Sequence, residues 1–322
     1  MDKAEKKWSP LDMPTEGMIF IVLIVMCVVL ALIKPAFISQ YNLSTLIRTI
    51  SWTTIVAFGQ TLVLLTGGID LSVAGIAGMS GIVSAYLMVN TGMNPFAAII
   101  LVLVLALGCG CLNGILITKL NMVPFIVTLA TGSVFTGVIY VMTKGSPILG
   151  ITESAVKLGQ GMLFGVIPYP ALFMILSCIV LAYIAGYTPF GRYIYAVGGN
   201  PKAAKIAGIK SGKVITLTYG ICAFMASIAG ILITCRLGTA QPSVGSDWVM
   251  PSVTAACIGG TSLSGGRGKI IGALVGGIFM GVISNAITIL AISTYWEKVI
   301  TGIVILVAIA IDRFKALRNN EL

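Results

Sequence analysis

The sequence predicts an all-α integral membrane protein with about ten transmembrane helices. Apolar residues make up 57% of the 322 residues, charged residues make up only 9%, and the mean hydropathy is +1.05. A soluble domain carries about 25% charged residues, so this chain has too few charges to build a water-exposed surface. Its apolar segments are distributed from end to end, which indicates one bundle in lipid.

The candidate spans follow from the need for about 20 mostly apolar residues to cross a bilayer. The first follows a polar tail and ends at Lys34-Pro35 without a small-residue cleavage site, so we interpret it as a retained span and not a signal peptide. The eighth is short and rich in Ser, Thr and Gly, and we expect it to be broken or re-entrant. The ten spans are 18–34, 49–66, 71–90, 95–118, 122–143, 166–186, 214–236, 248–263, 270–291 and 295–312.

The distribution of basic residues predicts the orientation. With the N-terminus inside, 14 of the 20 Lys and Arg residues fall in cytoplasmic segments, as the positive-inside rule expects. An even number of spans then puts both termini in the cytoplasm. We expect a tail at 1–17, a single transmembrane domain at 18–312 and a second tail at 313–322. The net charge of +10 reflects this arrangement and not nucleic acid binding, because the basic residues do not share one face.

Several kinds of chemistry are excluded. The chain has no histidine, and its seven cysteines lie in or beside apolar stretches without zinc-site spacing, so we expect no metal and no cofactor. The glycine-rich segment 259–268 lacks the Gly-Lys-Ser/Thr that completes a P-loop. We therefore expect no catalytic residues and no ATP hydrolysis by this chain itself.

The longest cytoplasmic connection, 187–213, contains a predicted short helix. Asn200 can cap a helix that starts at Pro201, and Gly208 can stop it. Small residues on such a helix suit docking into a groove of another protein, although a helix lying on the membrane surface has a similar pattern. The residues of this candidate docking helix are Asn200, Pro201, Lys202, Ala203, Ala204, Lys205 and Gly208.

Two glycine-rich breaks are further candidates. Gly67-Gly68 interrupt the helical pattern, and Asp70 can cap the helix that follows, at a helix end where water is near and an acid costs little. A structural role is the simplest interpretation, and a conformational or substrate role is the alternative. The second break is a tight cytoplasmic turn that contains Gly265, Gly266 and Arg267.

These segments resemble one family of transport proteins. Ala203-Ala204, followed by three residues and Gly208, resembles the EAA loop of ABC importer permeases, although Lys202 stands where that pattern has an acid. The segment 67–73 resembles the GGIDLSVG signature of ribose- and galactose-type permeases, with Ala74 in place of the usual Gly. Segments 258–268 and 125–131 are similar to other parts of the same family, and the resemblance extends over roughly 42–312.

The resemblance implies a transmembrane permease subunit of a bacterial ABC importer in the inner (plasma) membrane. Its cargo would be a monosaccharide or similar sugar, delivered by an extracytoplasmic solute-binding protein. An ATPase subunit would dock on the loop 187–213, which makes the predicted helix a coupling helix. A second permease chain, identical or related, would complete the path.

Uncharged polar residues within the spans suit a path for a neutral, hydroxyl-rich solute, although such residues also bond to neighbouring helices. An ion-coupled secondary carrier is the main alternative, but no carboxylate pair or histidine relay occurs within a span. An ABC permease for branched-chain amino acids or nucleosides is a second alternative. The candidate path residues are Gln60, Asn113, Thr128 and Asn285.

Overall fold

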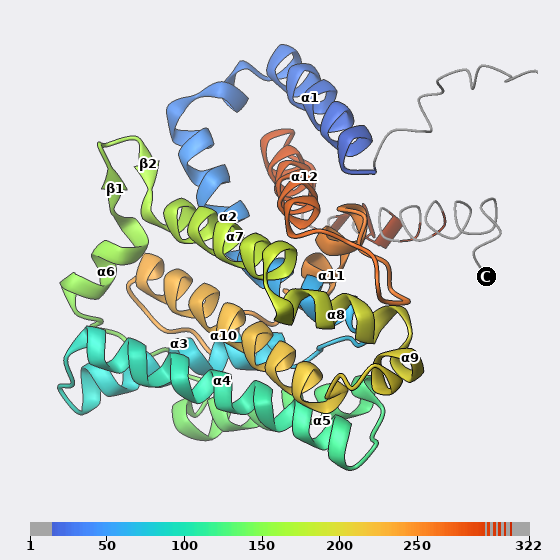
Figure 1. Ribbon diagram of the computed structural model, residues 1–322. Helices are drawn as coiled ribbons and strands as arrows, with labels where there is room; N and C mark the ends of the chain where they lie inside the picture. Colours follow the sequence, from blue (N-terminus) through green and yellow to red (C-terminus); the bar gives the residue numbers. More distant parts are fainter. Residues whose placement is uncertain are drawn as a thin grey trace, which may run out of the picture.

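The computed structural model describes residues 15–293 and, beyond them, 295–296, 299–300, 302–303, 306 and 310. Most of the predicted tenth span, most of the predicted tail 1–17 and all of the predicted tail 313–322 lie outside these residues. The elements are α1 (Thr15–Ile33), η2 (Pro35–Ile38), α2 (Gln40–Leu65), α3 (Val73–Asn90), α4 (Pro95–Lys119), α5 (Pro124–Thr143), α6 (Glu153–Gln160), β1 (Met162–Leu163), β2 (Ile167–Pro168), α7 (Tyr169–Tyr187), α8 (Pro189–Gly199), α9 (Pro201–Ile206), α10 (Ser211–Leu237), α11 (Val249–Ile258) and α12 (Ile270–Ile289) (Figure 1).

Helices of membrane-spanning length dominate this part of the chain. By length and composition, six helices can cross a membrane: α3, α4, α5, α7, α10 and α12. Each corresponds to a predicted span, so the chain is a multi-pass membrane protein. The fold is nearly all-α, as predicted.

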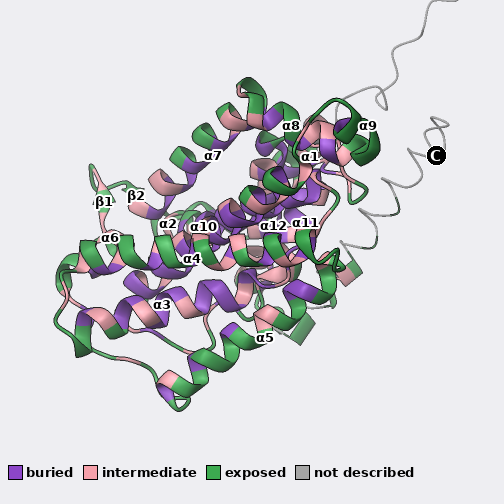
Figure 2. Ribbon diagram, turned by 60° about the horizontal axis from the view of Figure 1, so that its bottom comes forward, coloured by how far each residue is buried: buried purple, intermediate pink, exposed green. Residues whose placement is uncertain are grey.

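The burial pattern separates a central layer of helices from a lipid-facing layer. In α10, 67% of the most apolar 18-residue window is buried, whereas in α4 and α5 only 22% is buried. Figure 2 shows the same contrast, with buried residues concentrated in the centre of the bundle. Val104 of α4 and Val141 of α5 are exposed, as are many other large apolar side chains on these helices. Such a surface would aggregate in water and fits a lipid environment.

The eighth predicted span is a short helix followed by a turn. Helix α11 covers ten residues, which is about 15 Å of helix, or half of the hydrocarbon thickness. It stops at Gly259-Gly260, where the left-handed φ of +88° at Gly260 turns the chain back. The short helix agrees with the predicted interruption.

Two features near the hairpin end of the bundle were not predicted. A β-hairpin precedes α7, and its turn places Phe164 and Gly165 at φ +52° and +71°. The fold is therefore not strictly all-α. Helix α2 begins at Gln40, well before the predicted start, and includes Arg48, which the sequence had placed in an outer segment.

Arg48 is buried and anchors this region. Its guanidinium donates to the carbonyl oxygens of Gly159 and Gln160 at 2.9 and 3.0 Å. An arginine inside a membrane protein needs such acceptors because its charge is costly to bury alone. Arg48 therefore fixes the end of α6, and with it the start of the hairpin, against α2.

Candidate translocation core and docking face

The connection between α2 and α3 has the predicted glycine break. Helix α2 ends at Leu65, and Gly67 adopts φ +78°, a conformation that glycine takes without strain. The chain then turns through Gly68 and Asp70 before α3 starts at Val73. Gly67 and Gly68 therefore lie in the break between α2 and α3.

The expected environment of Asp70 was wrong. The sequence suggested a helix end near water, but the side chain is completely buried. Its Oδ1 accepts hydrogen bonds from the N–H of Ser72 at 2.9 Å and from the Ser72 hydroxyl at 2.6 Å. Asp70 thus binds the residue that precedes α3, in the manner of an Asx turn, and does not occupy the N-cap position itself.

The depth of Asp70 follows from its neighbours. Asn113, which joins it through Ser72, lies about 9 Å along α4 from the helix end at Lys119, at 1.5 Å per residue. Tyr219 lies about 12 Å inside the start of α10 at Ser211. The α2–α3 connection is therefore drawn into the bundle and covered by longer helices.

Three of the four candidate path residues meet at this connection. The Gln60 amide donates to the carbonyl oxygen of Asp70, and the Asn113 amide donates to the Ser72 hydroxyl at 2.9 Å. The Thr128 hydroxyl lies 3.4 Å from the carbonyl oxygen of Ile69, although it makes a shorter bond of 2.9 Å to its own helix. We call this group the Asp70 network, and its members are Gln60, Ile69, Asp70, Ser72, Asn113, Thr128 and Tyr219.

Tyr219 is a member that sequence reasoning missed. Its ring is completely buried, and its hydroxyl donates to the carbonyl oxygen of Ile69 at 3.3 Å. A tyrosine in an apolar helix gives little indication of such a role, because its partner is a main-chain atom distant in sequence. The Asp70 network as a whole joins α2, α4, α5 and α10 to one connection.

One acceptor atom of the network, the buried Oδ1 of Asn113, lacks a hydrogen-bond donor among the described residues. The Asp70 carboxylate has a further hydrogen-bond partner in the thiol of Cys222 on α10. Buried polar atoms without partners are costly, so this arrangement is stable only if the surrounding helices hold it together. Polar side chains concentrated at a helix break inside the bundle are typical of transport proteins.

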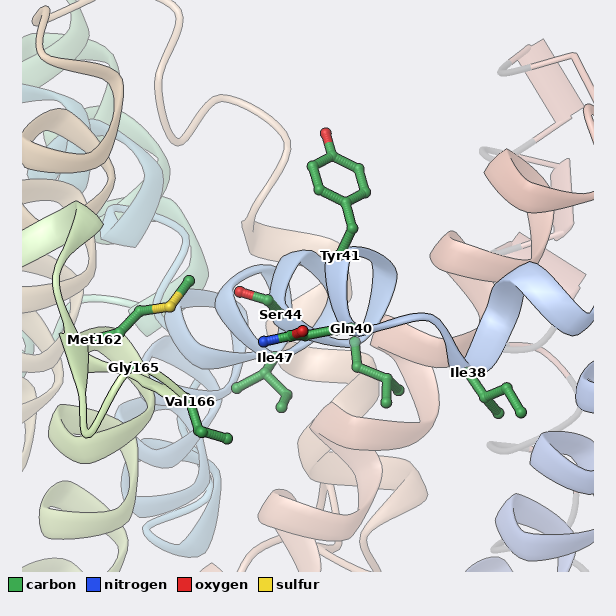
Figure 3. Close-up of a pocket in the computed structure, with 9 residues that line it drawn as sticks. Ile38, Gln40, Tyr41, Ser44, Ile47, Met162, Gly165 and Val166 are labelled. Atoms are coloured by element: carbon green, nitrogen blue, oxygen red, sulfur yellow. The ribbon is translucent and has the colours of Figure 1, made fainter.

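The fourth candidate path residue lies elsewhere. Asn285 of α12 forms a reciprocal amide pair with Asn42 near the start of α2, with bonds of 2.9 and 3.1 Å. A pocket of about 570 Å³ lies between this end of α2 and the β-hairpin. Figure 3 shows its lining side chains, among them Ser44, Ile47 and Val166. None of the candidate path residues lines this pocket.

A second site joins the predicted cytoplasmic turn to the ends of two helices. The N–H of Gly266 donates to the carbonyl oxygen of Leu65, the last residue of α2, at 2.9 Å. Gly198 in α8 lies so close to the same carbonyl that a β-carbon there would overlap it. The Tyr195 hydroxyl donates to the carbonyl oxygen of Gly268 at 2.9 Å, and burial raises the pKa of this phenol. We call this contact of α2, α8 and the 259–268 turn the glycine junction.

The short helix predicted to start at Pro201 is present as α9. The Asn200 side chain accepts a hydrogen bond from the N–H of Ala203 at 3.0 Å, and Pro201 occupies the first turn. Gly208, at φ +78°, ends the segment as expected. Ala204 is buried, whereas Lys202 and Lys205 are exposed, so α9 rests on the bundle by one side only.

The spanning helices, the buried polar connection and the exposed α9 define a membrane transport protein. Residues 42–309 match the family described as branched-chain amino acid transport system / permease component, and the chain belongs to this family. It is a transport component and not an enzyme.

Three relatives illustrate the similarity. The chain is 41% identical to the ribose import permease protein of Bacillus subtilis (strain 168), with 92% of both chains covered. It is 34% identical to the D-allose transport system permease protein of Escherichia coli (strain K12), over 92% of this chain and 91% of that one. It is 31% identical to the galactose/methyl galactoside import permease protein of the same strain, over 98% and 99%. No solved structure matches the chain.

Proposed function

We propose that this chain is the permease subunit of an ATP-driven ABC importer that translocates a monosaccharide, with ribose as the first candidate. The observation that carries the proposal is the 41% identity to a ribose import permease along 92% of both chains. Other relatives are named for allose, fructose and galactose, so these similar proteins are sugar permeases. The similarity favours a sugar over an amino acid or a nucleoside as cargo.

The arrangement in the membrane is part of the proposal. The chain spans the inner (plasma) membrane about ten times and has both termini in the cytoplasm, as the bias of basic residues favours. The transmembrane domain covers 18–312, between the tails 1–17 and 313–322. The short α11 is the cytoplasmic half of an interrupted span, because it leads directly into the turn 259–268, which contacts the end of α2. A second permease chain, identical or related, completes the path, because the polar groups of one chain are largely enclosed by its own helices.

The partners act at opposite ends of the bundle. Helix α9 lies at one end and the β1–β2 hairpin at the other (Figure 1). An ATPase subunit docks on the α9 end, along residues 200–208. A solute-binding protein delivers the sugar at the hairpin end. ABC importer permeases work with both kinds of partner.

The glycine junction supplies a route for coupling. Closure of the ATPase subunits moves α8 and α9, and the junction passes this displacement to the end of α2 at Leu65. The α2–α3 connection is the next segment of the chain, so the displacement also moves this connection and the Asp70 network. Rocking of helices between two packed arrangements then alternates access, while the energy comes from different ATP affinities of the two states.

The candidate path residues take a role in this cycle. Gln60, Asn113 and Thr128 hold the connection in the present arrangement, and movement of α2 frees their polar groups for sugar hydroxyls. Asn285 belongs to the opposite end of the path, where its bond to Asn42 joins α12 to α2. These roles are proposals that mutation can separate.

The test is transport by the complete importer in proteoliposomes. We expect labelled ribose to accumulate only when the ATPase subunit, ATP and the binding protein are all present. Unlabelled ribose should compete, and leucine and adenosine should not. Competition by leucine or adenosine would reassign the cargo. Uptake by this chain alone, driven by an ion gradient without ATP, would refute the proposal.

A further inference from the structure

Helices α4 and α10 pack closely against each other at the surface of the bundle (Figure 1). A β-carbon at Gly114 would overlap the backbone of Thr216, and a β-carbon at Gly212 would lie 3.6 Å from the β-carbon of Thr118. These contacts pair 114 with 216 and 118 with 212, so the two helices are antiparallel. The last turn of α4 therefore lies beside the first turn of α10, at the end of the bundle that carries α9.

Two lysines share one side of this helix pair. Lys119 follows Thr118 on α4, and Lys213 follows Gly212 on α10. Because the helices run in opposite directions, the step of 100° from each contact turns both lysines toward the same side of the pair. Both lysines are exposed. The axes of packed helices lie about 8–10 Å apart, so both flexible side chains can reach one group between them.

The same side of the pair is apolar toward the middle of the membrane. Leu112 and Ile115 on α4 lie within 40° of Lys119 around the helix, and Leu217 on α10 lies 40° from Lys213. All three apolar side chains are exposed. Only 22% of the most apolar window of α4 is buried, so this side of the pair belongs to the lipid-facing layer (Figure 2).

The two lysines have no acidic neighbour among the residues whose side chains the structure describes. The chain contains no Asp or Glu within 71–152 or 154–246, and these ranges include α4, α5, α9 and α10. Asp70 is buried and bonds to Ser72, and Glu153 pairs with Lys157 near the hairpin. Two like charges side by side repel each other, so this position favours an anion between them.

We propose that Lys119 and Lys213 bind the headgroup phosphate of one anionic phospholipid, whose acyl chains lie along Leu112, Ile115 and Leu217. Charge complementarity selects the anionic headgroup, and the apolar side below the lysines selects a lipid over a soluble anion or a polar protein surface. The inference rests on the membrane-spanning fold, and it depends neither on the cargo nor on the ATPase subunit.

The experiment measures lipid binding to the purified full-length permease in detergent by native mass spectrometry. Phosphatidylglycerol and phosphatidylcholine with the same acyl chains are titrated separately. A lysine near an anionic headgroup strengthens binding about fivefold, so we expect wild-type permease to bind phosphatidylglycerol at least tenfold more tightly than phosphatidylcholine. Lys119→Gln/Lys213→Gln should abolish this preference. Leu217→Ser should instead weaken the binding of both lipids alike, by about threefold, because it shortens the apolar surface that the acyl chains cover.

The matched control is Lys202→Gln/Lys205→Gln on α9. It removes the same charge at the same end of the molecule from two other exposed lysines, and it should leave the preference for phosphatidylglycerol unchanged. Without added lipid, all of these variants should unfold at the wild-type temperature, since every changed side chain is exposed.

Three results would overturn the inference. The first is equal binding of the two lipids by the wild type, or a preference that survives Lys119→Gln/Lys213→Gln. The second is an equal loss of preference in the α9 control, which would show general attraction to the basic end and no discrete site. The third is displacement of phosphatidylglycerol by millimolar inorganic phosphate, which would assign the lysines to a soluble anion. Because the permease is measured alone, none of these results bears on the proposed transport function.

Discussion

Replacement of Asp70 tests whether the buried carboxylate acts through its hydrogen bonds or through its charge. Asp70→Leu removes the acceptor of the Ser72 N–H and hydroxyl. The buried N–H of Ser72 then lacks its acceptor, at a cost of about 1–3 kcal/mol. Asp70→Asn keeps Oδ1 as an acceptor and removes a buried charge, so we expect its free energy of unfolding to stay within about 1 kcal/mol of the wild type.

The assay is unfolding of the purified permease by a denaturing detergent, followed by size-exclusion chromatography. Glu153→Gln is the control, because Glu153 is an exposed acid whose bond to Lys157 is worth less than about 1 kcal/mol. If Asp70→Asn destabilises the protein as much as Asp70→Leu, the charge itself is required. That result would refute the assignment of the side chain as a hydrogen-bond acceptor.

Three further predictions concern helix contacts. Gly68→Ala places a β-carbon against the hydroxyl of Tyr219 and should cost about 1–3 kcal/mol of stability in the same unfolding assay. The double variant Gly68→Ala/Tyr219→Phe should lose less stability than the sum of the losses of the two single variants. Gly198→Ala should lower ATP-driven uptake in proteoliposomes without unfolding the protein, because it forces α8 away from the end of α2. Gly199→Ala is the control and should leave uptake unchanged, because a β-carbon at Gly199 would meet no neighbouring atom within 4 Å. Equal losses of uptake in the two variants would contradict the role of the junction. Asn285→Ala should cost about 1–2 kcal/mol of stability through loss of its amide pair, and reduced uptake at unchanged stability would instead indicate direct contact with the solute.

Features decided by neighbouring residues could be predicted from the sequence. Gly67-Gly68 end a helix because a left-handed glycine satisfies the carbonyl groups of its last turn, whatever surrounds it. The helix from Pro201 follows in the same way from the Asn200 cap and the Gly208 stop. The spanning helices follow from apolar length alone.

Features decided by the packing of distant segments could not be predicted. The burial of Asp70 depends on how far α4 and α10 extend beyond the α2–α3 connection, which no local pattern shows. Gln60, Asn113 and Thr128 are polar residues in apolar spans, but their convergence on one connection is a property of the assembled bundle. The hairpin was missed because Phe164 adopts a positive φ that its residue type does not favour.

The glycine junction has a consequence for how such importers diversify. Its closest contacts join main-chain atoms of Leu65, Gly198 and Gly266. A contact between backbones places no demand on the side chains that line the rest of α2, beyond the absence of a β-carbon at the glycines. The cargo can therefore change by substitution along the path while the connection to the ATPase end keeps the same form.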